Sequence, residues 1–143
     1  MVFPIISLRN LFSMTIVIAI LMVILWYLYS QNKIFTRKLI IKKRRYFYYK
    51  NQIKVIKNIS KDINEKFERL SQILREFFYE YYQLKYSLTY LEVSNKFQQQ
   101  KLPELAKFCK QISDLKYSGT EVNEKNINGL INTFENILDS KLP

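Results

Sequence analysis

An apolar stretch free of charge lies near the start of the chain. From Leu11 to Tyr29, eleven residues are Leu, Ile, Val or Phe, and none is charged. A helix of this length spans about 28 Å at 1.5 Å per residue, close to the roughly 30 Å hydrocarbon core of a bilayer. The pattern predicts one transmembrane helix over residues 11–29, preceded by a short extracytoplasmic segment, residues 1–10.

Three aromatic residues mark the C-terminal end of this stretch. Trp26, Tyr27 and Tyr29 are of the type that settles at the headgroup level of a membrane. The competing interpretation is a cleavable signal peptide, which needs a basic start, a shorter apolar stretch and small residues at the cleavage site. Bulky rings stand where small residues would be needed, so the pattern favours a retained anchor.

Beyond the anchor, apolar residues recur at every third or fourth position, and no Gly or Pro occurs between Leu11 and Leu102. Long helices are therefore expected. One amphipathic helix is predicted from about residue 61 to 91, with an extension back toward the membrane left open, and residues 92–101, which lose the pattern, are expected to form a loop or a frayed short turn. The predicted apolar face comprises Ile53, Ile56, Ile59, Ile63, Phe67, Leu70, Leu74, Phe77, Tyr81, Leu84, Leu88 and Leu91.

Two further helices are predicted after this loop. Pro103 and Glu104 suit the first turn of a helix, Gly119 suits its end, and Asn123 can cap the next one. The chain is thus predicted to be all-α, with a small cytoplasmic helical bundle over residues 61–140 after the transmembrane helix. Its expected core comprises Phe67, Leu70, Leu74, Leu105, Phe108, Ile112, Leu130, Ile131 and Phe134.

The distribution of charge predicts the orientation of the anchor in the membrane. The net charge of +11 arises beside the apolar stretch, because no acidic residue precedes Asp62, whereas ten Lys or Arg lie between positions 33 and 57. Positive residues concentrate on the cytoplasmic side of a spanning helix. We therefore expect a single-pass membrane protein with its N-terminus outside and its C-terminal domain in the cytoplasm. Residues 30–60 are expected to form a basic, helical juxtamembrane segment.

A cluster of four cations, Lys42, Lys43, Arg44 and Arg45, precedes an aromatic run. Such a cluster can bind nucleic-acid phosphates while the rings stack on bases. It can equally rest on anionic lipid headgroups. The short distance along the chain from the predicted anchor favours lipid over nucleic acid.

The amino-acid composition excludes most kinds of catalytic site. The chain has no His, one Cys and two Gly, so it lacks the commonest general base, the commonest metal ligand, an internal disulfide and a glycine-rich phosphate loop. Cys109 falls on an apolar stripe, where a buried and inert thiol is expected. A non-enzymatic protein without a cofactor or metal is therefore predicted.

Aromatic residues are most dense between positions 77 and 90, where seven occur in fourteen residues. One apolar stripe leaves Phe78, Tyr79, Tyr82 and Tyr86 on adjoining faces. Surplus Tyr and Phe are typical of partner interfaces, but they also fit a helix that is covered on two sides by the rest of a bundle. Both interpretations remain open, and Tyr117 is a further candidate for partner binding.

Three short runs also resemble a known family: the Phe78-Tyr79 pair, the Leu102-Pro103-Glu104 helix start, and DLKYSG at residues 114–119. Together they resemble the cytoplasmic tail of the Bat aerotolerance proteins, over roughly residues 10–140 in order of elements and about a dozen residues in detail. The resemblance implies an adaptor or assembly factor in the bacterial inner membrane, with a MoxR-type AAA+ ATPase or a von Willebrand factor A protein as partner. The family's large extracytoplasmic β-rich region has no counterpart here, and Lys116 stands where the family usually has Arg.

Overall fold

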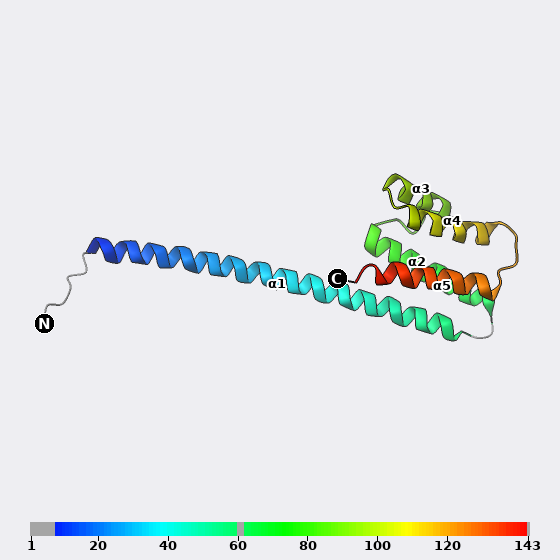
Figure 1. Ribbon diagram of the computed structural model, residues 1–143, viewed down its shortest axis with the longest axis horizontal. Coiled ribbons are helices and arrows are strands. Elements are labelled where there is room, and N and C mark those ends of the chain that lie inside the picture. Colours follow the sequence, from blue (N-terminus) through cyan, green and yellow to red (C-terminus); the bar gives the residue numbers. More distant parts are fainter. Residues whose placement is uncertain (1–7, 60–61, 143) are drawn as a thin grey trace. The chain divides into compact units, whose positions relative to one another are not determined.

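A computed structural model describes residues 8–59 and 62–142, and in these residues it contains helices and no strand. The chain divides into two compact units, Met1–Lys42 (unit 1) and Lys43–Pro143 (unit 2). The predicted all-α class is confirmed for the described residues. The helices are α1 (Leu8–Asn58), α2 (Ile63–Tyr82), α3 (Tyr90–Gln99), α4 (Pro103–Tyr117) and α5 (Glu124–Asp139) (Figure 1).

The described residues of unit 1 all belong to the first part of α1. Their most apolar window has a mean hydropathy of 2.6, and none of it is buried. The hydroxyls of Ser13 and Thr15 donate to backbone carbonyl oxygens one turn earlier, at 2.9 and 2.7 Å, so these polar groups are satisfied inside the helix. The part of the chain that the structure describes thus contains one helix long and apolar enough to cross a membrane.

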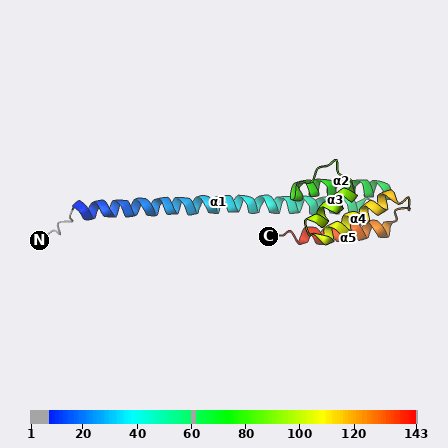
Figure 2. The same ribbon diagram turned by 90° about the horizontal axis from the view of Figure 1, so that it is seen from above.

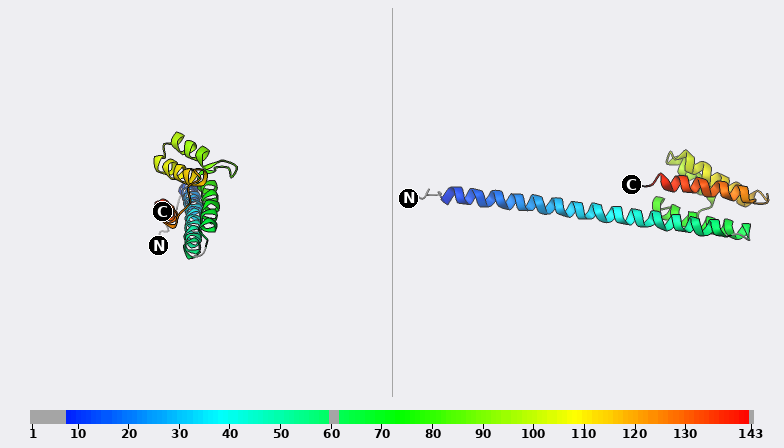
Figure 3. Two further views of the ribbon diagram at one scale, coloured as in Figure 1. Left: turned by 90° about the vertical axis from the view of Figure 1, so that its right-hand side faces the viewer. Right: turned by 60° about the horizontal axis from the view of Figure 1, so that its bottom comes forward.

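In unit 2, residues 43–58 of α1 lie beside α2 and α5, which both run antiparallel to them (Figures 1 and 2). Side-chain hydrogen bonds join the three helices. The Tyr49 hydroxyl donates to Glu80 of α2 at 2.9 Å, and the Lys57 ammonium donates to Glu135 of α5 at 2.8 Å. Helices α3 and α4 pack mainly against each other and form a second layer (Figure 3).

The core of unit 2 confirms the nine predicted core residues, all of which are buried. It also contains three side chains of α1, namely Tyr49, Ile53 and Ile56, which are at most 1% exposed. The predicted bundle began at residue 61, but the compact unit begins at Lys43. The basic stretch of α1 therefore carries an apolar stripe that completes the core.

The predicted helix over residues 61–91 is wrong, because α2 ends at Tyr82. Gln83 adopts a left-handed conformation, with φ of 56°, and Leu84 N–H donates to the Phe78 carbonyl oxygen across the end of the helix. This closure satisfies carbonyl groups that the last turn would leave unpaired. Leu84 and Leu88 still pack on the core from the connection, so the apolar periodicity continues across a break in the helix. Two residues of the predicted apolar face, Ile63 and Leu91, are exposed.

The predicted loop over residues 92–101 is also wrong, because most of it belongs to α3. Thr89 and Glu92 form a capping box: the Thr89 hydroxyl accepts from Glu92 N–H, and the Glu92 carboxylate accepts from Thr89 N–H at 2.8 Å. This box satisfies two backbone donors at the start of the helix. Val93 and Phe97 are buried, so α3 contributes to the core despite its polar composition.

The two later helices begin and end as predicted. Pro103 is the first residue of α4, which ends at Tyr117, and Gly119 follows with φ of +68°. Asn123 caps α5, since its side-chain oxygen accepts from Asn126 N–H at 2.8 Å. These signals act within a few residues of the helix ends, so the sequence alone reveals them.

Candidate docking groove

The predicted partner-binding aromatic residues do not form one surface. Phe78 lies in the core and is 2% exposed, as expected if the rest of the bundle covers this helix on two sides. The reason is α3, which covers α2 on this side and places the Phe97 ring 5.3 Å from the Phe78 ring. Tyr90 is also buried, where its hydroxyl bonds to Ser71.

Tyr79 and Tyr86 stay on the surface. Their rings stack with centroids 4.9 Å apart and an interplanar angle of 25°, and each side chain is about half exposed. Tyr117 is exposed at the C-terminal end of α4, and Pro103 lies at the N-terminal end. The predicted set is therefore divided among the core, a stacked pair, the exposed ring of Tyr117 and the partly buried ring of Tyr82.

The predicted membrane-interface residues are exposed in both units. In unit 1, Trp26, Tyr27 and Tyr29 are each more than half exposed. The four cations Lys42, Lys43, Arg44 and Arg45 are exposed as well. Arg45 differs from the others in the described residues, because its Nε lies 3.8 Å from a carboxylate oxygen of Glu80.

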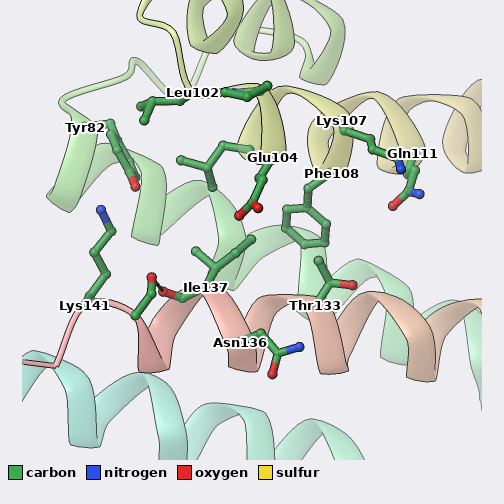
Figure 4. A pocket seen from close by; sticks show the side chains of 13 residues that line it. Tyr82, Leu102, Glu104, Lys107, Phe108, Gln111, Thr133, Asn136, Ile137 and Lys141 are labelled. Carbon is green, nitrogen blue, oxygen red and sulfur yellow. Dashed lines mark hydrogen bonds between the residues drawn. The ribbon is translucent and has the colours of Figure 1, made fainter.

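Tyr82 lies at one end of a groove between α4 and α5 (Figure 4). The groove has a volume of about 700 Å³. Its floor contains the buried side chains Leu105 and Phe108 of α4 together with the partly buried Ile137 of α5. Its rim is polar and exposed, and is formed by Glu104, Lys107, Gln111, Asn136, Ser140 and Lys141.

The Tyr82 side chain is held by its neighbours while its hydroxyl has no partner. Its ring meets the Phe97 ring edge-on at 5.0 Å, and the Lys141 Nζ lies 5.0 Å from the ring centroid. The hydroxyl oxygen is buried and has no hydrogen-bond partner within the described residues. A buried polar group left unpaired costs about 1–3 kcal/mol.

The lining of the groove has an excess of positive charge. Leu102 precedes α4 without a side-chain cap, and Pro103 occupies its first turn. The positive end of the helix dipole therefore faces the groove mouth without a capping oxygen. Along the groove as a whole, Lys107 and Lys141 are two cations against the single carboxylate of Glu104, and Lys107 lies beside Gln111 at the end away from Tyr82 (Figure 4). This arrangement suits an apolar segment that carries an acidic or hydrogen-bond-accepting group.

Groups suited to catalysis are few in unit 2. Burial raises the pKa of the Cys109 thiol to about 12, so almost no thiolate forms at neutral pH. Among residues 8–59 and 62–142, no three His, Cys, Asp or Glu side chains are grouped as metal ligands would be. The apolar floor and charged rim of the groove can support binding.

Sequence reasoning missed most of the groove. Gln111, Thr133 and Asn136 are ordinary polar residues that flank the buried stripes of two different helices. No local motif marks them, because the groove exists only once α4 and α5 are placed together. The available signal was the pair of apolar stripes, whose polar flanks must meet where two such helices pack.

No protein-family model matches the chain, and no similar protein was found among curated proteins or solved structures. The likeness to Bat tails rests on the short runs described above. What the residues themselves provide is an apolar groove with a charged rim in unit 2, in a chain that also contains a helix able to cross a membrane.

Proposed function

We propose that this chain is a non-enzymatic, membrane-anchored adaptor or assembly factor that docks a partner helix in the α4–α5 groove. Residues 11–29 anchor it in a bacterial inner membrane, and unit 2 lies on the cytoplasmic side. The observation that carries the proposal is the groove itself, with its apolar floor, charged rim and unpaired Tyr82 hydroxyl.

The apolar part of α1 supports the anchor. Its large apolar side chains are exposed, which is unfavourable in water and favourable in lipid. At about −0.3 to −0.6 kcal/mol for each Leu, Ile, Val or Phe, its eleven such residues favour insertion by several kcal/mol. The ten basic residues between positions 33 and 57 support a cytoplasmic unit 2.

The groove supports an amphipathic helix as the bound segment. In this binding mode, apolar anchors at helical spacing enter a hydrophobic groove while polar residues stay at its rim. Leu105, Phe108 and Ile137 supply the apolar floor, and Lys107 and Lys141 favour acidic residues beside the partner's apolar stripe. The resemblance to Bat tails proposes a MoxR-type ATPase or a von Willebrand factor A protein as the source of this helix.

Photo-cross-linking in cells tests the groove. A photoreactive residue placed at Gln111 or Asn136, on opposite walls, should cross-link to a co-produced MoxR-type ATPase or von Willebrand factor A protein. The same residue at exposed Asn51 of α1 should not. Equal cross-linking at all three positions, or at Asn51 alone, would contradict docking in the groove.

A matched pair of substitutions adds a quantitative test. Thr133→Trp fills the groove from α5, whereas Thr120→Trp places the same ring on an exposed loop. Thr133→Trp should weaken partner binding by tenfold or more, equivalent to about 1.4 kcal/mol, with helicity unchanged. Unaltered affinity in Thr133→Trp would place the docking site elsewhere.

A second candidate function is phosphate binding by the basic segment of α1. Lys42, Lys43 and Arg44 are exposed, and none forms an ion pair with any residue that the structure describes. Binding of lipid or nucleic-acid phosphates by this segment should weaken steeply with rising salt, whereas apolar docking in the groove should not.

A further inference from the structure

We propose that one end of unit 2, the end at which α1 enters it, rests on anionic phospholipid headgroups. The contact shares Lys141 with the rim of the groove, and it rests on the anchor part of the proposed function. It extends the basic segment of α1 by cations from three other parts of the chain. We call this surface the basic end and define it by Lys43, Arg44, Lys85, Lys101 and Lys141.

Contacts within unit 2 bring these parts together. The C-terminal end of α2 reaches α1 through Glu80, which lies 3.8 Å from Arg45. The C-terminal end of α5 reaches α1 through Asp139, which accepts a hydrogen bond from the Tyr46 hydroxyl at 2.8 Å. Leu102, next to Lys101, lines the groove together with Lys141. Figures 1 and 3 show the same gathering of helix ends within unit 2.

The cations of the basic end are available to an external anion. All five are exposed, and none is in an ion pair with any residue in the described ranges. Two nearby carboxylates, Glu80 and Asp139, are engaged by α1 instead. Glu80 accepts from Tyr49, and Asp139 lies 3.0 Å from the Lys50 Nζ, which lowers the pKa of that carboxyl. The basic end therefore carries more positive than negative charge, with Glu104 as the nearby carboxylate that α1 does not engage.

Exposed aromatic rings accompany these cations. Tyr79, near the end of α2, stacks on Tyr86, which follows Lys85 in the connection after α2. Phe47 of α1 is also exposed and follows Arg44 by about one helical turn. Tyr rings have an apolar body and a polar tip, which suits the headgroup region of a membrane. Cations beside such rings match a phospholipid surface, which offers phosphates and an apolar layer together.

Depth-dependent quenching tests this contact on the full chain in lipid nanodiscs. Ser87→Cys places a fluorophore two residues after Lys85, in the part of the connection that lies beside Arg75 of α2, and Thr120→Cys places one in the exposed segment after α4. Cys109 is buried, so the engineered thiol is the one that reacts. The discs contain anionic phosphatidylglycerol, and a nitroxide is attached to the lipid headgroups. It should quench the fluorophore at position 87 about twofold more than the fluorophore at position 120. The reason is that the attraction between cations and headgroups acts within about 10 Å.

Matched charge reversals show whether the excess quenching comes from attraction between the cations and the headgroups or only from the closeness of unit 2 to the membrane. The triple change Lys85→Glu, Lys101→Glu and Lys141→Glu should abolish the excess quenching at position 87. The control triple change at exposed Lys54, Lys110 and Lys125 should preserve it. Raising the salt from about 0.1 to 1 M, which shortens the Debye length from about 10 to 3 Å, should also remove the excess.

The outcomes distinguish the two proposals. A chain that does not co-elute with nanodiscs would refute the anchor and this contact together. A chain that co-elutes but shows equal quenching at both positions would refute the contact alone. Excess quenching that persists in neutral phosphatidylcholine discs, or after reversal of the basic end, would likewise overturn recognition of anionic lipid.

Discussion

At the residue scale, the fully buried side chains of unit 2 determine whether it folds. Leu74 and Phe134 are both 0% exposed. Replacing either with Ala removes buried methylene or ring atoms and leaves a cavity, at a cost of about 2–5 kcal/mol. Leu91→Ala, at an exposed position, should cost less than about 1 kcal/mol. Urea unfolding of the three variants measures this difference, and similar losses at all three positions would contradict the described core.

Gln83 holds a backbone conformation that glycine adopts more easily. Its φ of 56° lies in the left-handed region, where a side chain costs about 1–2 kcal/mol. Gln83→Gly should therefore raise the stability of unit 2 by up to about 1 kcal/mol. Gln72→Gly, the same change inside α2, should lower it by about 1 kcal/mol. Opposite signs in thermal unfolding are the expected result, and a loss in both variants would argue against a helix end at Tyr82.

Two buried groups predict alkaline sensitivity. Burial raises the pKa of the Tyr90 hydroxyl and of the Cys109 thiol to about 12 each. Both values exceed the unfolded ones, about 10 and 8.5, so the folded chain holds more protons. The stabilisation of the folded state by these two protonated groups is complete below pH 8.5 and is lost as the pH rises toward 12. The free energy of unfolding should fall from about pH 9 upward, and Cys109→Ala should flatten the first part of that fall. A constant value up to pH 11 would contradict burial of both groups.

At the element scale, α1 contributes to folding as well as to the predicted anchor. The large side chains of Tyr49, Ile53 and Ile56 are buried, and the burial of each stabilises unit 2 by about 1.5–3 kcal/mol. Their sum is comparable with the 5–15 kcal/mol that stabilises a typical domain. A fragment of residues 43–143 should therefore unfold cooperatively by circular dichroism. A fragment of residues 59–143 should show no cooperative transition, and equal melting of the two would remove α1 from the core.

The sequence predicted helix ends better than it predicted helix number. Pro103 and Asn123 act through backbone groups within one turn, so their positions were foreseeable. The break at Gln83 was missed because Leu84 and Leu88 continue the apolar period outside the helix. The start of α3 did carry a local signal, the Thr-x-x-Glu capping box at Thr89.

At the scale of the whole molecule, the surfaces proposed for binding could not be predicted in the same way. The groove combines polar flanks of α4 and α5, such as Lys107 and Thr133. The basic end combines side chains from four parts of the chain, such as Arg44 and Lys141. Neither has a sequence period or motif, because each arises from packing between distant segments. The apolar stretch and the charge beside it are local, so the predicted anchor and its direction were available from the sequence.

The central claim is that a membrane anchor holds unit 2 at the cytoplasmic face. Fusing a reporter that is fluorescent only in the cytoplasm after Pro143, and measuring fluorescence in carbonate-washed bacterial membranes, tests anchor and orientation together. Carbonate removes peripheral proteins, and the excess of basic residues after the apolar stretch predicts a C-terminus that faces the cytoplasm. We expect the fluorescence to remain in the washed membranes. Fluorescence released into the soluble fraction, or a membrane-bound fusion that is not fluorescent, would contradict this account.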